Sequence, residues 1–342
     1  MNVIATVTSM LERMPVPDPL LRAGIAHFVG RTHRRMAAAP LGVEIAFASG
    51  MRTHPIAEHT DAANAQHYEL PAAFFGLVLG PHRKYSSCLY HTASDTLEQA
   101  EANALTATCS HADLRDGQNL LELGCGWGSL TLWMASHYPN ARITAVSNSV
   151  AQRNYILSAA GARGLTNLTV MTADMNAFET SARFDRVVSI EMFEHMANWE
   201  ALLSRVRTWL HPDGKLFLHV FSHEAAPYRF DQSDPADWIA QHFFTGGIMP
   251  SHRLVRCFPH LFEVEKDWRW DGRHYQRTAE AWLANYDENA REIEEILRDV
   301  YGPDASLWRR RWRLFFLAVG GLFGHAEGLA WGVSHYRLAP VS

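Results

Sequence analysis

Three glycines alternate with other residues in Glu122-Leu123-Gly124-Cys125-Gly126-Trp127-Gly128, and this short segment constrains the fold more than any other. A strand-like apolar run, 119–123, leads into it, and a helical pattern begins near Ser129. Glycine has no side chain, so backbone N–H groups in such a loop can approach a ligand, and the following helix terminus adds partial positive charge. Tight turns alone explain many glycine trios. The strand before and the helix after favour an α/β fold with a nucleotide-type ligand at this loop.

Strand-like apolar runs alternate with helical patterns through the middle of the chain. Alternation of this kind is typical of a parallel sheet covered by helices on both faces. We therefore predict a Rossmann-like α/β fold with a mostly parallel, seven-stranded sheet. Pro212-Asp213-Gly214 has the composition of a turn. The predicted strands are 119–123, 142–146, 168–173, 184–190, 215–221, 262–268 and 331–338.

The two ends of the chain depart from this alternation. Helical patterns at 20–39 and 70–79 predict that residues 1–94 form a helical N-terminal cap. Residues 95–342 then form the ligand-binding domain, which opens with a helix whose capping box pairs Asp95 with Glu98. Later helical patterns at 282–300 and 308–323 predict an insertion at about 270–328 that covers the active side.

Composition excludes several classes of protein. The 342 residues carry a formal net charge of −5, which argues against a nucleic-acid partner even with 19 histidines. The four cysteines lack paired zinc-ligand spacing, so we expect free thiols in a reducing cytoplasm and no metal. No apolar run approaches the roughly 20 residues that span a bilayer. We expect no integral membrane contact, and the oligomeric state stays open, a homodimer included.

The spacing of the glycines narrows the choice of ligand class. Dinucleotide-binding loops typically read G-x-G-x-x-G and have an acidic residue about 20 positions later. Here the glycines alternate, which favours S-adenosylmethionine (SAM) over NAD. The second strand leads into Ser147-Asn148-Ser149 without the usual carboxylate, so Asn148 and Gln152 are candidates for the ribose hydroxyls, unless this is a surface turn. Asp174 and Met175 are candidates for the adenine, with a helix cap as the alternative.

The segment from Ser189 to Met196 follows the fourth strand, at the end of the sheet where open α/β folds bind ligands. If it is helical, Glu191, Glu194 and His195 share one face. Transfer of a methyl group needs an acceptor with a free lone pair and a place for its proton. His195 suits the role of base, and either glutamate could orient it or hold an ammonium group. A solvated charged turn is the alternative.

These motifs resemble the coclaurine N-methyltransferase group of the cyclopropane-fatty-acid synthase superfamily, whose members are class I SAM-dependent methyltransferases. The resemblance covers nearly the whole chain. Its most specific parts are 189–196 and the loop His242-Phe243-Phe244-Thr245-Gly246-Gly247, since the fold itself demands neither. The matching stretches are 68–80, 84–86, 120–128, 144–149, 187–196, 242–251, 312–316 and 334–336.

The resemblance implies roles for individual residues. It places Glu191, Glu194 and His195 at a small, aromatic or cyclic amine acceptor. Aromatic residues would line the acceptor pocket, where their π faces could stabilise a cationic amine, although an ordinary apolar helix face is an equal alternative. The aromatic candidates are Trp312, Phe315 and Phe316, and the implied SAM contacts are Tyr85, Ser86, Gly124, Gly126, Asn148, Gln152, Asp174, Met175 and Ile190.

Two other functions stay open at this stage. Cyclopropane synthases resemble the chain at Glu194, His219 and Tyr275, which they use around a bound bicarbonate, so modification of unsaturated lipid acyl chains is the alternative activity and His219 and Tyr275 are candidate acceptor contacts. Against it, Ser87 replaces their usual cysteine and Glu191 their usual glycine. A carboxylate is costly to bury beside an acyl chain but useful beside an ammonium group. A binding protein without turnover is the third class.

Overall fold

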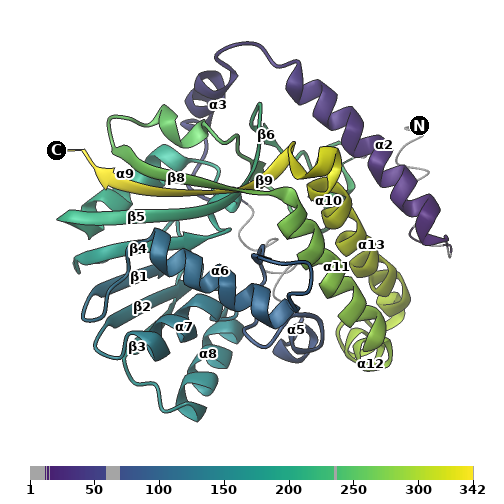
Figure 1. The fold of residues 1–342 in the computed structure, drawn as a ribbon, viewed down its shortest axis with the longest axis horizontal. Coiled ribbons are helices and arrows are strands. Elements are labelled where there is room, and N and C mark those ends of the chain that lie inside the picture. Colours follow the sequence, from purple (N-terminus) through teal and green to yellow (C-terminus); the bar gives the residue numbers. More distant parts are fainter. Residues whose placement is uncertain (1–11, 13, 15, 59–69, 235–236, 342) are drawn as a thin grey trace.

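The computed structural model describes residues 12, 14, 16–58, 70–234 and 237–341. Within them, seven strands form one sheet in the order β3-β2-β1-β4-β5-β9-β8, which confirms the predicted fold class (Figure 1). The first five strands run parallel and the last two pair antiparallel. The strands are β1 (Asn119–Leu123), β2 (Arg142–Ser147), β3 (Leu168–Thr172), β4 (Phe184–Ile190), β5 (Leu210–His223), β8 (Phe262–Asp271) and β9 (Trp331–Pro340).

Helices bury both faces of this sheet. One face packs against α6 and α7 through a cluster that includes Leu105, Leu130 and Phe217. The other face packs against α9 and α3 through a cluster that includes Trp199, Val187 and Met51. Residues of alternating strand positions feed these two cores, as a sheet buried on both faces requires. These helices are α3 (Val43–Met51), α6 (Leu97–His111), α7 (Ser129–His137) and α9 (Trp199–Trp209). A fifth helix, α8 (Val150–Ala162), contacts α7 and β3.

The remaining helices gather beyond one end of the sheet (Figure 1). A third apolar cluster joins α5 to α11, α12 and α13, and α2 packs along α13. Three of these helices, α11, α12 and α13, lie between β8 and β9, where the sequence predicts an insertion. The bounds are α2 (Asp18–Ala37), α5 (Ala72–Val78), α10 (Trp238–His242), α11 (Gly272–Glu288), α12 (Ala290–Tyr301) and α13 (Ala305–Phe323), with a small sheet of β6 (Tyr228–Arg229) and β7 (Ile248–Met249).

Three local predictions are wrong in detail. The capping box of α6 pairs Thr96 with Gln99, and the Asp95 carboxylate instead accepts the backbone N–H groups of the preceding turn. The predicted helix 282–300 is two helices, because the chain breaks at Asn289. The turn at 212–214 lies inside β5, as an irregularity between the pairs Phe184–Leu210 and Arg186–Lys215.

Some predictions lie outside the described residues, namely the start of the cap at 1–11 and the first two positions of the stretch 68–80. The division into a cap at 1–94 and a domain at 95–342 stays a prediction. Across the described ranges, no helix is both long and apolar enough to cross a bilayer.

The strand order places the functional site. β1 lies between β2 and β4, and the chain crosses from one side of β1 to the other between β3 and β4. Open α/β sheets bind ligands at the carboxyl ends of their strands beside such a reversal. The glycine loop follows β1 and the Ser189–Met196 segment follows β4, so the two strongest sequence signals meet at this position.

Candidate active site

The three glycines of the loop serve different purposes. All three have positive φ, 78° at Gly124, 52° at Gly126 and 79° at Gly128, a region that L side chains rarely occupy. A Cβ atom at Gly124 would come within 2.6 Å of the Met192 side chain, and one at Gly128 within 2.6 Å of Ile156. At Gly126 a Cβ atom would meet nothing within 4 Å. Close packing therefore demands the outer glycines, and the middle one borders open space.

That open space belongs to a cavity of about 750 Å³, with a smaller neighbouring cavity of about 90 Å³ beyond the glycine loop. All nine predicted SAM contacts line one or both of them. Tyr85, Ser86 and Ile190 line the larger cavity, and Asn148, Asp174 and Met175 line the smaller. Gly124, Gly126 and Gln152 line both.

Gln152 carries an incomplete hydrogen-bond set that fits a ligand. Its Oε1 accepts from Ser147 Oγ over 2.7 Å, which fixes the orientation of the amide. Its Nε2 is buried and has no partner among the described residues. A buried donor without a partner is costly. A ribose hydroxyl in the cavity would satisfy it, so the chemistry of this residue fits the predicted cofactor.

Glu191 lies at the wall of the larger cavity with its carboxylate held from three directions. Oε1 accepts from the backbone N–H of Ser87 over 3.0 Å and lies 3.1 Å from His219 Nε2. Oε2 accepts from the Tyr275 hydroxyl over 2.7 Å. Glu191 itself has a φ of 47°, a left-handed conformation that costs a non-glycine residue about 1 to 2 kcal/mol. The surrounding donors hold the carboxylate in this strained position.

Glu194 is fully buried and lines neither cavity. It lies in the short 3-10 helix Phe193–His195, and its Oε1 accepts the backbone N–H of Phe221 over 2.6 Å. Its Oε2 is buried without a partner among the described residues. Burial, and next the charge of Glu191, raises the pKa of Glu194 well above its ordinary value. Burial also raises the pKa of Glu191, against the pull of Lys84 and two hydrogen bonds. Burial therefore favours the protonated form of both carboxyl groups.

His195 completes the polar wall. It lines both cavities, and its ring lies 4.4 Å from the ring of Phe244, centroid to centroid. The prediction that Glu191, Glu194 and His195 share one helical face is wrong, because Glu191 precedes the 3-10 helix and has a left-handed backbone. This bend brings Glu191 and His195 to the cavities, whereas Glu194 is buried and lines neither of them.

Of the five predicted acceptor residues, two line the larger cavity and three are buried behind its wall. Tyr275 and Phe315 line the larger cavity. Trp312 and Phe316 are fully buried in the cluster between α5, α11 and α13 and do not line it, because they lie on the inner face of α13. His219 is likewise fully buried and reaches the cavity only through Glu191.

Part of the lining of the larger cavity was not predicted from the sequence. Helix α2 contributes Leu21, Ile25 and Phe28, and the core contributes Phe221 and Phe244. The α2 residues recur at helical spacing, which signals an apolar face. That signal does not say whether the face meets the protein core or a ligand.

Residues 57–318 match the family model described as mycolic acid cyclopropane synthetase. The chain is 32% identical to (S)-coclaurine N-methyltransferase of Thalictrum flavum subsp. glaucum, over 97% of this chain and 95% of that protein. A crystal structure of coclaurine N-methyltransferase bound to N-methylheliamine and SAH superposes with a TM-score of 0.94 at 33% identity, covering 98% of this chain and 99% of that one. The cyclopropane-fatty-acyl-phospholipid synthase of Escherichia coli K12 is 30% identical over 69% of this chain and 60% of its own length.

Proposed function

The chain belongs to the mycolic acid cyclopropane synthetase family and is a SAM-dependent N-methyltransferase within it, and we propose that its acceptor is a small aromatic or cyclic amine. In this proposal Glu191 binds the acceptor nitrogen in its ammonium form, and His195 removes the proton before methyl transfer. The observation that carries the proposal is the position of the Glu191 carboxylate and the His195 ring on one cavity wall beside the glycine loop.

The cofactor is SAM, which when bound supplies an electrophilic methyl group on a positively charged sulfur. We propose that the glycine loop, Gln152 and Asn148 hold it from the carboxyl ends of β1 and β2, with Asp174 and Met175 at the adenine. Tyr85, Ser86 and Ile190 border the larger cavity, where they would separate the cofactor from the acceptor.

An amine reacts only through its free lone pair, so an ammonium acceptor has to lose a proton at the site. Glu191 accepts hydrogen bonds from the Ser87 backbone N–H and the Tyr275 hydroxyl, which fix the position of its carboxyl group at the cavity wall. It is therefore suited to holding the cation. His195 is suited to removing the proton, because an imidazole titrates near neutral pH and the ring borders the cavity.

The shape of the larger cavity supports an aromatic or cyclic acceptor. Its lining includes the aromatic side chains of Phe244, Phe315 and Phe323, the last two of them on α13. Aromatic faces attract cations and pack well on flat rings. A carboxylate at the wall of such a cavity disfavours an acyl chain, because an acyl chain offers the charge neither hydration nor a cationic partner.

A labelling screen tests the proposal. The enzyme is incubated with methyl-labelled SAM and either a panel of amines, including tetrahydroisoquinolines, or vesicles of unsaturated phospholipid. We expect label in cyclic amines and none in lipid. Label confined to lipid would replace the proposal with acyl-chain modification, and SAM binding without any labelled product would indicate a protein without turnover.

A further inference from the structure

Three histidines continue the hydrogen-bond network of Glu191 away from the cavity. His219 Nε2 lies 3.1 Å from Glu191 Oε1, and His219 Nδ1 lies 2.8 Å from His335 Nε2. His335 Nδ1 in turn lies 2.8 Å from His111 Nδ1. His219 and His335 are direct partners across β5 and β9, and His111 is the last residue of α6. Every junction of this histidine chain is within hydrogen-bonding distance.

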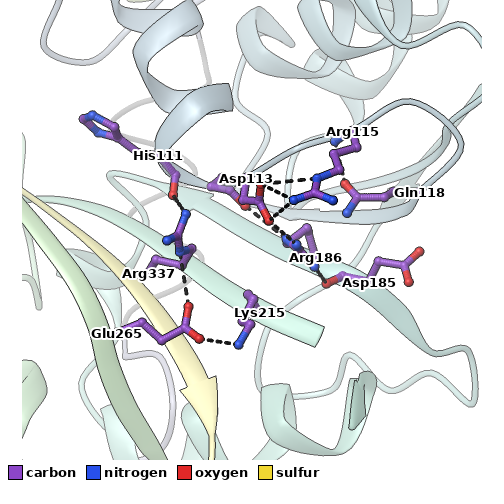
Figure 2. A network of polar contacts seen from close by, with 10 residues as sticks. His111, Asp113, Arg115, Gln118, Asp185, Arg186, Lys215, Glu265 and Arg337 are labelled. Carbon is purple, nitrogen blue, oxygen red and sulfur yellow. Dashed lines mark hydrogen bonds and ion pairs between the residues drawn. The ribbon is translucent and has the colours of Figure 1, made fainter. Parts of the chain in front are cut away.

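The histidine chain runs from the buried site to a partly exposed end. His219 and His335 are fully buried, and the indole of Trp270 packs against both rings. His111 is half-buried, and its ring stacks on Trp268 with 3.9 Å between centroids. Figure 2 shows the backbone of His111 held by Arg337, which pairs with Glu265. The His111 ring is thus fixed at the outer end of the path.

The ionisation of these rings leaves only two arrangements of protons. Burial lowers the pKa of His219 and of His335 well below the ordinary value, and lowers that of His111 to about 4. All three rings are therefore neutral at pH 7, and each has one donor and one acceptor nitrogen. With Glu191 ionised, every N–H points toward Glu191. With Glu191 protonated, every N–H points outward. The two arrangements differ by one proton.

We propose that His219, His335 and His111 form a rear proton path through which Glu191 exchanges its proton with solvent while the acceptor fills the cavity. The inference rests on the proposed function, because it gives Glu191 the task of binding a cation. In this proposal the carboxyl group holds a proton while the site is empty, as its burial favours. Entry of a cationic acceptor favours the carboxylate, and the acceptor itself blocks the route through the cavity.

The proton balance of this exchange is simple. Glu191 passes its proton to His219 Nε2, and His219 Nδ1–H passes to His335 Nε2. His335 Nδ1–H then passes to His111 Nδ1, and His111 Nε2–H passes to water or a buffer base. One proton leaves the carboxyl group and one reaches solvent, with no net charge left on any ring. When the product departs, the same steps run in reverse and restore the protonated carboxyl group.

The charges around the path fit a proton that moves outward. Lys84 is buried and faces Glu191, His219 and His335, so it favours the carboxylate and disfavours a cation on either ring. Lys266 and Arg337 face His111 and keep it neutral. At the inner end, Glu194 and Tyr275 face Glu191. A cation is thus unfavourable at every ring of the path.

A permanently charged probe shows whether a proton released on binding comes from the protein or from the acceptor. N,N-dimethyl-tetrahydroisoquinolinium has no N–H, so any proton released when it binds comes from the enzyme. The SAH-loaded enzyme is mixed with this cation in a stopped-flow instrument containing a pH indicator, and tryptophan fluorescence reports binding. We expect release of close to one proton in the wild type and none in Glu191→Gln. His335→Gln should bind the cation but release the proton at least about tenfold more slowly, because an amide cannot relay it.

Two further variants complete the test. His252→Gln is the matched control, because His252 contacts Ser334 and Tyr336, the neighbours of His335 on β9, but lies outside the path. It should behave like the wild type. His111→Ala should be slow, and added imidazole should restore its rate. Equal release rates in wild type and His335→Gln would overturn the rear path, whereas failure of both this cation and tetrahydroisoquinoline to bind would overturn the proposed function.

Discussion

The Tyr275 hydroxyl donates a 2.7 Å hydrogen bond to Glu191 Oε2 and so joins the inserted helix α11 to the loop after β4. Burial and the neighbouring carboxylate raise the pKa of Tyr275 well above its ordinary value, so the hydroxyl keeps its proton. The carboxylate that faces the cavity therefore depends on a side chain from the insertion. The insertion thus supplies part of the cavity lining and a hydrogen bond to the Glu191 carboxyl group.

Tyr275→Phe should lower kcat/KM for the amine about tenfold, because a hydrogen bond to a charged group contributes about 1.5 kcal/mol or more. The ring should stay in place, since it stacks on Phe323 at 4.2 Å between centroids. Steady-state kinetics and SAM titration measure the two effects separately. Tyr286→Phe is the matched control on the same helix, because its hydroxyl donates to the backbone oxygen of Arg309 and Tyr286 lines neither cavity. A similar kinetic loss in both variants would argue against a specific role for Tyr275.

Glu194→Gln should retain most of the wild-type activity. The side chain is protonated in the folded protein, so an amide replaces a neutral carboxyl group of the same shape and can still accept from the Phe221 N–H. The measurement is kcat across pH 6 to 9. Glu191→Gln removes a charge at the cavity and should lose far more. Equal losses in the two variants would mean that Glu194 also works as a carboxylate.

The sequence was sufficient for the sheet and for the cofactor end of the site, for a physical reason. Buried parallel strands require continuous apolar runs, and the glycine loop requires residues without side chains, so both leave local patterns. β1 and β4 were predicted with their observed bounds, and the loop and Gln152 were predicted at the cavity.

The acceptor end was less predictable because it depends on contacts between distant segments. The carboxyl group of Glu191 is held by Ser87 and Tyr275, which lie 104 and 84 positions away in the chain. Trp312 and Phe315 are three positions apart on α13, yet only Phe315 lines the cavity. Which side of an aromatic helix meets the ligand is fixed by packing against α5 and α11, and no local pattern carries that information.

Gly126→Val should abolish or strongly weaken SAM binding in a protein that still folds. The new side chain would project into the open space that the loop borders, and the positive φ adds a cost of about 1 to 2 kcal/mol. Calorimetric titration with SAM measures the loss, which we expect to exceed about 100-fold. Gly117→Val is the control, because Gly117 also has positive φ and open space around it but does not line either cavity. Unchanged affinity in folded Gly126→Val would remove the loop from the cofactor site.

His195→Ala should lower kcat by about 100-fold or more, the usual contribution of a general base. SAM affinity should change little, since the glycine loop and Gln152 remain. The decisive readout is the pH profile of kcat. If His195 removes the acceptor proton, the acidic limb of the wild-type profile should disappear in the variant and the remaining rate should rise with hydroxide concentration. Parallel losses of kcat and SAM affinity with an unchanged pH profile would indicate that His195 only supports the cavity wall next to Phe244.

Glu122→Gln should make the folded protein less sensitive to pH. Burial raises the pKa of Glu122 to about 8, against a single hydrogen bond from Thr131 Oγ1 at 2.5 Å. The folded protein therefore keeps this carboxyl group protonated where the unfolded chain ionises, at about pH 4.3. The unfolded state binds fewer protons between these two values, so the free energy of unfolding falls as pH rises, by at most about 1.4 kcal/mol per pH unit from this group. The stabilising contribution is complete below the unfolded pKa and is lost as pH rises through the folded pKa.

Urea unfolding of the SAM-free protein at pH 5.5, 7 and 8.5 should show a steeper decline of the unfolding free energy with pH in the wild type than in Glu122→Gln. Glu288→Gln, at the exposed end of α11, should follow the wild type. If the unfolding free energies of the wild type and Glu122→Gln decline in parallel, Glu122 is ionised in the folded protein. Its buried charge is then stabilised by a donor of the glycine loop or by a neighbouring backbone N–H.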